Sequence, residues 1–369
     1  MKKYDVAAYI WPAFTGKEPR TKLFWPKGIG EWESIQSAEK KFPEHSWPRH
    51  PLWGYVDEAD PAVMQMEINE ASRHGVNVFI YDWYWFDDRP FLENCLNDGF
   101  LKAANNDKMK FYLMWANHDA TTTWRKEIAH VDNTVLWQGS VDRPRFERVV
   151  HRVIKQYFSH PSYYKIEGKP VFMLYDFNNL VKGLGGAANT KKALDWFREE
   201  TVKAGFPGLH LQLVAWGGHN LTVEYPDEYG EMKPVNFEDM PFDSITNYQY
   251  AHYVYMDMDY LDVLEAVKKE YARVDQAYHT TYFPHVSVGW DNNPRFVTRV
   301  KNVARNNTPE NFEKALRMAK EYVDTHDLPA PLITVNSWNE WAETSYLEPD
   351  DVNGYGYLEA VKRVFMDEE

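Results

Sequence analysis

Two acidic residues, Glu340 and Glu343, lie three positions apart where an apolar run gives way to polar and aromatic residues. If the chain turns helically there, side chains at i and i+3 share a face, with Cβ atoms roughly 5 to 6 Å apart. Retaining glycosidases hold their two carboxyl groups about 5 to 5.5 Å apart. Acetal cleavage needs one carboxylic acid and one carboxylate, so this pair would suffice. The same two residues would also suit the first turn of a solvated helix, where the dipole favours acidic side chains.

Eight short apolar runs, each bounded by turn residues, predict the strands that would position this pair, and the segments between them show helical spacing. This alternation predicts an α/β fold, namely a (β/α)8 TIM barrel that residues 1–369 form as a single domain. A doubly wound sheet is the structural alternative, and the lack of a glycine-rich phosphate turn disfavours it. The predicted strands cover residues 4–10, 76–84, 110–117, 170–176, 209–216, 244–250, 285–290 and 332–338.

Two of the predicted helices have recognisable ends. Asp60 and Pro61 are typical of a helix cap and first turn, and Gly75 lies where that helix must stop. Thr308 and Pro309 open another helix. Each carries an apolar stripe that we expect to pack on the barrel. The stripes consist of Met64, Ile68 and Ala71 in the first helix, and of Phe312, Ala315, Leu316, Ala319, Tyr322 and Val323 in the second.

The overall composition excludes several classes of function. The formal net charge is -14, which repels nucleic-acid backbones, and no apolar stretch approaches the length of a membrane span. The single cysteine, Cys95, cannot form an internal disulfide and leaves the redox compartment open. The first residues contain no apolar signal core. We therefore expect either a cytoplasmic protein or the mature form of an exported one.

The longest connections between the predicted strands, residues 11–59 and 217–243, would enlarge one rim of the barrel. Barrel enzymes place their sites at the rim formed by the carboxyl ends of the strands. The chain has 15 Trp and 24 Tyr, whose flat rings with polar tips suit the faces of sugars, although aromatic residues also fill protein cores. A sugar site at this rim is thus compatible with the composition.

Polar and aromatic residues recur together at the predicted strand ends, as a sugar subsite requires both stacking and hydroxyl recognition. Arg295 would either anchor an anionic substituent or form a surface salt bridge. His118 and Asp119 lack a third ligand at metal-binding spacing, so we expect no metal and no cofactor. The candidate substrate-binding residues at the strand ends are Asp82, Tyr84, Trp115, Asn117, His118, Asp119, Tyr175, Asp176, Trp216, Tyr248, Trp290 and Asp291.

The segment Ser337–Glu343, with the sequence SWNEWAE, and the following Tyr346–Pro349 resemble the signature of glycoside hydrolase family 99 and its relatives. The resemblance covers nearly the whole chain and adds Tyr9, Trp11, Glu31, Trp32, Trp338 and Asn339 to the candidate substrate-binding residues. The other segments, which resemble the WbsX-like branch in the same order, are Tyr9–Pro12, Gly30–Trp32, Tyr81–Trp85, Met114–Asn117, Ile166–Pro170 and Gly289–Asn292.

The resemblance implies a specific chemistry for the carboxylate pair. Family 99 enzymes are retaining, metal-independent endo-α-mannosidases on a (β/α)8 barrel, thought to pass through a 1,2-anhydro sugar. Carried over, Glu340 would deprotonate the 2-hydroxyl of the substrate, and Glu343 would be the general acid and then the base for water. Ala342 and Thr344 stand where the characterised enzymes often have His and Gly, so the sugar and the subsite shape are less well implied.

Three functions remain open at this stage. A retaining glycoside hydrolase that degrades a polysaccharide or oligosaccharide, by resemblance at an α-mannoside-like linkage, is the main prediction, with a carbohydrate as its partner and a monomer as its state. The WbsX-like branch is often named a glycosyltransferase, but Asp87-Asp88 and Asp350-Asp351 resemble exposed loop charges more than a metal-nucleotide site. A non-catalytic sugar-binding barrel is the third possibility, although pure binding gains little from two buried acids.

Overall fold

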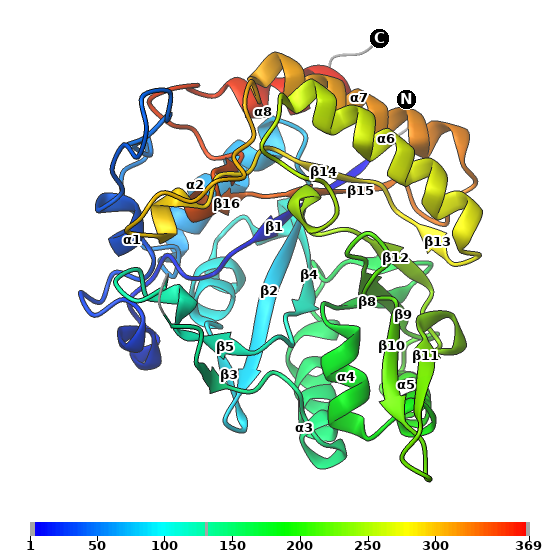
Figure 1. The fold of residues 1–369 in the computed structure, drawn as a ribbon. Helices are drawn as coiled ribbons and strands as arrows, with labels where there is room; N and C mark the ends of the chain where they lie inside the picture. The colour runs from blue at the N-terminus through cyan, green and yellow to red at the C-terminus, as the bar shows by residue number, and fades with distance from the viewer. Residues whose placement is uncertain (1–3, 130–131, 367–369) are drawn as a thin grey trace.

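The computed structural model describes residues 4–129 and 132–366. Parallel strands form a barrel with helices around much of its outside (Figure 1). This arrangement confirms the predicted α/β barrel. The strands, in the order in which they pair, are β1 (Asp5–Ile10), β2 (Val78–Phe86), β4 (Lys110–Trp115), β8 (Lys169–Leu174), β9 (His210–Val214), β12 (Ser244–Thr246), β13 (Thr281–Tyr282), and then β14 (His285–Ser287) and β15 (Leu332–Asn336), which returns to β1.

The seventh strand of the barrel is divided into two short strands, β13 and β14, which together close the ring. β13 pairs with β12, whereas β14 pairs with β15. Phe283 and Pro284 lie between them: the Phe283 amide donates to Ile245, and the Pro284 carbonyl accepts from Thr334, both at 3.0 Å. Because proline has no N–H, it cannot continue a regular ladder. The prediction of a seventh strand over 285–290 therefore missed its first part.

Seven α-helices, counted over the described residues from α2 on, lie along the chain between or after the strands. The Asp60 side chain accepts a hydrogen bond from the Ala62 amide, and the Thr308 side chain accepts one from Asn311, so both predicted helix caps are confirmed. The predicted apolar stripes are buried. These helices are α2 (Pro61–Arg73), α3 (Arg143–Val153), α4 (Phe177–Leu184), α5 (Ala187–Lys203), α6 (Tyr260–Ala277), α7 (Pro309–Thr325) and α8 (Gly356–Phe365).

The predicted alternation of strand and helix fails in two connections. Between β2 and β4 the chain forms the short strand β3 (Arg89–Phe91), a π-type turn over Cys95–Gly99 and two 3₁₀ turns, with no α-helix among the described elements of this connection. Between β9 and β12 it forms the hairpin of β10 (Thr222–Pro226) and β11 (Met232–Asn236), with no α-helix in this described stretch. Gly230, at φ 82°, lies in the loop of the hairpin. Two short runs joined by a glycine-containing loop favour a hairpin over a helix.

Short elements build the rim at the carboxyl ends of the barrel strands. A helix, α1 (Trp32–Gln36), lies within the long segment between β1 and α2. Every helix in the described part of the chain is too short or too polar to cross a lipid bilayer. The remaining strands are β3 (Arg89–Phe91), β5 (Ala120–Thr121), β6 (Val135–Trp137), β7 (Lys165–Ile166), β16 (Asn339–Glu340) and β17 (Ser345–Tyr346).

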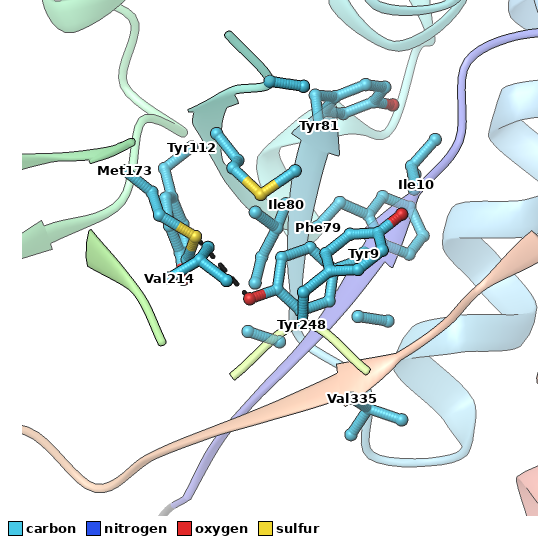
Figure 2. Packing of buried hydrophobic residues seen from close by; sticks show 14 of the residues in the cluster. Tyr9, Ile10, Phe79, Ile80, Tyr81, Tyr112, Met173, Val214, Tyr248 and Val335 are labelled. Atoms are coloured by element: carbon cyan, nitrogen blue, oxygen red, sulfur yellow. Dashed lines mark hydrogen bonds between the residues drawn. The ribbon is translucent and has the colours of Figure 1, made fainter. Parts of the chain in front are cut away.

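The interior of the barrel combines aromatic packing with buried hydrogen bonds (Figure 2). The Tyr9 hydroxyl donates to the Asn247 carbonyl at 2.9 Å and lies 3.6 Å from the Met173 sulfur, the contact dashed in Figure 2. The Tyr9 and Tyr248 rings are 4.8 Å apart between centroids. Tyr112 donates to Gln212 at 3.1 Å. Because Tyr9 packs on Tyr248 from inside the barrel, this layer forms the floor beneath the strand ends.

Gly30 makes a close approach that a side chain would prevent. Its φ is 63°, and an added Cβ would lie 1.8 Å from the Ala13 carbonyl oxygen. Gly54 also has a positive φ, 76°, but open space around it, so it is a matched control. We expect Gly30→Ala to lower the free energy of unfolding in urea by about 1–3 kcal/mol more than Gly54→Ala, because only the first adds a clash to the backbone strain. Equal losses would contradict this expectation.

Candidate active site

A cavity of about 270 Å³ lies at the carboxyl ends of the barrel strands, with Glu340 and Glu343 both in its wall. It contains side chains that follow or end β1, β2, β4, β8, β9, β12 and β15. Its lining is Trp11, Asp82, Tyr84, Met114, Ala116, His118, Trp124, Tyr175, Trp216, Tyr248, Arg295, Glu340 and Glu343.

A tight turn after β15 presents the carboxylate pair. The Ser337 hydroxyl accepts from the Glu340 amide at 2.6 Å and donates to the Ser345 carbonyl at 2.7 Å. A 3₁₀ turn over Trp341–Glu343 follows, and Thr344, at φ 54°, ends it. The helical turn expected between the two acids is thus a single 3₁₀ turn that leaves both facing the same cavity.

Arg295 holds three acidic side chains around one guanidinium group. Its Nη1 lies 2.9 Å from Glu343 Oε1, and its Nη2 lies 3.5 Å from Glu340 Oε2. Its Nε donates to Glu31 Oε1 at 3.1 Å, and Trp11 Nε1 donates to Glu31 Oε2 at 2.6 Å. The side chain is only 13% exposed, so the expected surface salt bridge is instead a buried one. The positive charge of Arg295 is therefore paired with carboxylates of the protein itself.

Burial and mutual repulsion change the protonation of the pair. Burial, and then the charge of Glu343, raise the pKa of Glu340 well above its usual value, while Arg295 opposes the shift. Burial also raises the pKa of Glu343, with Arg295 again opposing. Because the two groups titrate as a pair, a proton held at one favours the charged form of the other. One acid and one carboxylate is the state that acetal cleavage requires.

Tyr248 connects this pair to a third buried acid. Its hydroxyl oxygen lies 2.9 Å from Asp82 Oδ2 and 3.1 Å from Glu340 Oε1. A tyrosine hydroxyl donates a single proton, so one of these contacts requires a protonated carboxyl group. Burial raises the pKa of Asp82 well above its usual value, which fits that requirement. Asp82 Oδ1 is buried and has no hydrogen-bond partner among the described residues.

Aromatic rings also line the cavity. The Tyr84 ring lies 5.8 Å from Trp124 and 5.5 Å from His118, and the Tyr175 ring lies 5.1 Å from Trp216, all between centroids. Burial lowers the pKa of His118, so its ring is neutral, and its Nδ1 lies 2.9 Å from the Asp119 carbonyl oxygen. The indole N–H of Trp216 is buried without a partner among the described residues. The wall thus combines stacking surfaces with polar tips, as sugar recognition requires.

Comparison with known proteins identifies the family. Residues 6–361 match the family described as Glycosyltransferase WbsX. The chain belongs to this family. Two curated relatives, both described as uncharacterized protein WxcX of Xanthomonas campestris pv. campestris, are 25% identical over 355 residues, which is 94% of this chain and 47% of each relative. The chain therefore spans about half the length of the curated relatives that it matches.

Solved structures with a similar fold include glycoside hydrolases. The GH99 endo-alpha-mannosidase from Bacteroides thetaiotaomicron is 14% identical, with a TM-score of 0.61 over 98% of this chain and 96% of that one. A protein described as glycoside hydrolase-like is also 14% identical, with a TM-score of 0.63 over 99% of this chain and 94% of that one. At such identity the likeness shows a shared fold, whereas the family match confirms the WbsX part of the predicted resemblance.

Several predicted site residues of this WbsX-family chain lie outside the cavity because side chains alternate along a strand. Trp115, Asn117 and Asp119 alternate with the cavity residues at the end of β4 and in the segment that follows it, and they do not line the cavity. Trp115 packs on Phe146 of α3, and Asp119 accepts from the Gly139 amide at 2.8 Å. We predicted that Trp115, Asn117, His118 and Asp119 all contact the substrate. This prediction needs correction, because only His118 of the four lines the cavity.

Asp176 and Asn117 instead fix the rim after β8. Asp176 caps α4 by accepting from the Asn179 amide, and Asn117 donates to the Asp176 carbonyl at 2.7 Å. Trp32 is also outside the cavity: its ring packs on Phe14 at 4.1 Å between centroids, and its indole donates to the Val56 carbonyl. These residues shape the rim without lining the cavity.

The remaining predicted residues support the cavity from behind or lie beside it. Tyr9 is part of the floor, and Glu31 acts through Arg295. Trp338 donates to Glu67 at 3.0 Å, and Asn339 donates to Glu58 at 2.8 Å, so both point toward α2 and away from the carboxylate pair. None of these four lines the cavity.

Trp290 and Asp291 of this WbsX-family chain line a second, larger cavity of about 430 Å³. It shares no lining residue with the first, and Thr344, next to Glu343, lies in its wall. Its buried groups are already paired: His45 Nε2 lies 2.8 Å from Asp291 Oδ2. Because Glu340 and Glu343 converge in the smaller cavity, it is the candidate active site.

Sequence reasoning missed three lining residues of the smaller cavity. Met114 lies in β4 and Ala116 follows it, and both alternate in step with His118, so continuing the alternation of the strand past its end would have found both. Trp124 comes from a 3₁₀ turn in the long connection after β4, and no local pattern places that turn against Tyr84.

Proposed function

We propose that this chain is a retaining glycoside hydrolase that cleaves α-mannoside-like linkages in a polysaccharide or oligosaccharide. One observation carries the proposal: Glu340 and Glu343 converge on Arg295 in a cavity that aromatic rings also line. Two acids with raised pKa values beside stacking rings suit acetal cleavage and hydroxyl recognition together.

In the proposed first step, Glu340 removes the proton of the substrate's 2-hydroxyl, and the 2-oxygen attacks the anomeric carbon. Glu343 protonates the leaving oxygen as the glycosidic bond breaks, which gives a 1,2-anhydro sugar. In the second step Glu343 accepts a proton from water, and the water oxygen attacks the anomeric carbon. The bond from that carbon to the 2-oxygen breaks, and Glu340 returns the proton to the 2-oxygen. Two inversions at one carbon give net retention.

The two positions at which this chain departs from family 99 lie on either side of Glu343 in the sequence. Ala342 and Thr344 do not line the smaller cavity. Thr344 lies in the wall of the second cavity, where its hydroxyl donates to the Asp291 carbonyl at 2.8 Å and accepts from Trp47 at 2.9 Å. In this proposal the chemistry at the smaller cavity is that of family 99, and the altered turn changes the shape of the neighbouring subsite.

Two observations favour hydrolysis over transfer from a sugar nucleotide. Asp88 is engaged with Arg145 and Arg148, both at 2.7 Å, at the surface. Asp350 is buried and accepts from Tyr346 at 2.6 Å, so its predicted exposure is wrong. Neither acidic pair adjoins the smaller cavity. A non-catalytic sugar-binding barrel would not explain the two acids that one buried arginine holds together.

The test is release of reducing ends from a panel of α-mannans, other mannans and pectins, with and without nucleotide-sugars. We expect new reducing ends from an α-mannan without any nucleotide. Elongation of a glycan that depends on a nucleotide-sugar would instead establish a transferase. Calorimetric binding of oligosaccharides without turnover across the panel would establish a binding protein.

A further inference from the structure

Three glutamates meet behind the turn after β15 that carries Glu340 and Glu343, which we call the catalytic turn. They lie outside both cavities. Glu58, Glu67 and Glu348 each offer an oxygen, and these oxygens all lie within 4.8 Å of one another. All three residues are buried, with exposures of 0%, 0% and 3%. Glu58 precedes α2, Glu67 lies in α2, and Glu348 follows β17. In the part of the chain that the structure describes, no lysine or arginine forms an ion pair with them, so three acids share a dry site without a balancing charge.

Each carboxylate is held from behind by one neighbour of Glu340. The Trp338 indole donates to Glu67 Oε2 at 3.0 Å, the Trp341 indole to Glu348 Oε2 at 2.5 Å, and the Asn339 amide to Glu58 Oε1 at 2.8 Å. The other oxygens of Glu67 and Glu348 are buried and lack a hydrogen-bond partner among the described residues. A buried carboxylate oxygen without a partner is costly, so these two atoms indicate a missing ligand.

We propose that Glu58, Glu67 and Glu348 bind one divalent cation of the oxygen-preferring class, with Ca²⁺ favoured over Mg²⁺. Carboxylate oxygens are the preferred ligands of both ions, and N–H donors that orient the carboxylates from outside are typical of metal sites. Ca²⁺ binds oxygen at about 2.3–2.6 Å, so oxygens on opposite sides lie about 5 Å apart, whereas Mg²⁺ at about 2.0–2.1 Å requires a tighter cage. Oxygens within 4.8 Å of one another fit around Ca²⁺, and three protein carboxylates favour it because Mg²⁺ usually keeps several waters and binds only one or two carboxylates.

The cation would tie the catalytic turn to α2. Its three ligands are held by the side chains of Trp338, Asn339 and Trp341, which flank Glu340. It would lie outside the reaction cavity and take no part in proton transfer.

The experiment measures metal on the whole chain, independently of hydrolysis. Protein purified without chelator is analysed for metal content, then stripped and titrated calorimetrically with Ca²⁺, Mg²⁺ or Mn²⁺ alone. Tb³⁺, which takes oxygen ligands as Ca²⁺ does, gives a second readout, because the Trp338 and Trp341 indoles contact the ligands and would sensitise its emission. We expect one Ca²⁺ per chain, a raised melting temperature on addition, and sensitised Tb³⁺ emission that Ca²⁺ displaces.

Glu67→Gln and Glu348→Gln should each weaken Ca²⁺ binding at least tenfold, while Glu228→Gln, an exposed glutamate, should leave it unchanged. If either buried variant fails to fold, the wild-type Tb³⁺ and calcium titrations still decide. No metal in the purified chain, and no binding or stabilisation by millimolar Ca²⁺, Mg²⁺ or Mn²⁺, would overturn the proposal and leave protons as the partners of the three acids. Full binding in a folded Glu67→Gln variant would overturn it as well.

Discussion

Glu343→Gln is expected to lower kcat on a natural glycan by roughly 10²–10⁴-fold, because the leaving oxygen loses its proton donor. Glu340→Gln should cause a similar loss, because the 2-hydroxyl loses its base. Both variants keep the shape of the cavity, so oligosaccharide binding should remain measurable by calorimetry. Turnover is measured as release of reducing ends.

The two roles are separated by the leaving group of the substrate. An aryl α-mannoside with an acidic phenol needs no protonation to depart, so Glu343→Gln should recover its first step on that substrate, whereas Glu340→Gln should not. Glu228→Gln, exposed and distant in sequence from both acids, is the matched control and should retain wild-type turnover. Unchanged turnover of the glycan in either active-site variant would refute the assignment of that residue.

Arg295→Met should destabilise the fold by about 3–5 kcal/mol near neutral pH, since it leaves buried carboxylates without their partner. Arg295 faces Glu31, Glu340 and Glu343, and these charges raise its own pKa even though burial lowers it. Without the arginine, the folded-state pKa values of the two catalytic acids rise further above the unfolded value of 4.5. A raised carboxyl pKa reduces stability as the pH rises above that unfolded value, so the loss should shrink toward acid pH.

Urea unfolding of wild type and Arg295→Met at about pH 4 and pH 7 measures this dependence. Arg145→Met is the matched control: it removes an arginine that pairs with Asp88 at the surface, and it should have far less effect at either pH. A loss of stability in Arg295→Met that does not depend on pH would contradict a charge-stabilising role of Arg295, because it would indicate lost packing alone.

Much of the barrel was predictable from local patterns. Long apolar runs such as β2, and caps such as Asp60 and Thr308, have a single reading in the sequence. The broken seventh strand and the β10–β11 hairpin did not, because Thr281–Tyr282 is too short for a periodic signal and a barrel tolerates more than one kind of connection. In both cases pairing with distant strands decides the local structure.

The position of the candidate site was predictable from the sequence, but the direction in which each side chain points was not. The carboxylate pair was found because both acids lie on one turn, and Asp82 and Tyr84 because they alternate with Trp83. The cluster of Glu58, Glu67 and Glu348 was missed, since its members are far apart in the sequence and only the packing of α2 behind the last strand brings them together. Long-range contact of this kind leaves no local pattern.

The ring of strands is weakest where the seventh strand is split. β12, β13 and β14 have three, two and three residues, whereas β2 has nine. With so few ladder hydrogen bonds, this seam is where the ring opens at the lowest free-energy cost, and its amides should exchange with solvent ahead of those in β1 and β2. Tyr248 lies two residues after the end of β12, so local opening at the seam should reach the bridge between Asp82 and Glu340 before the rest of the barrel unfolds.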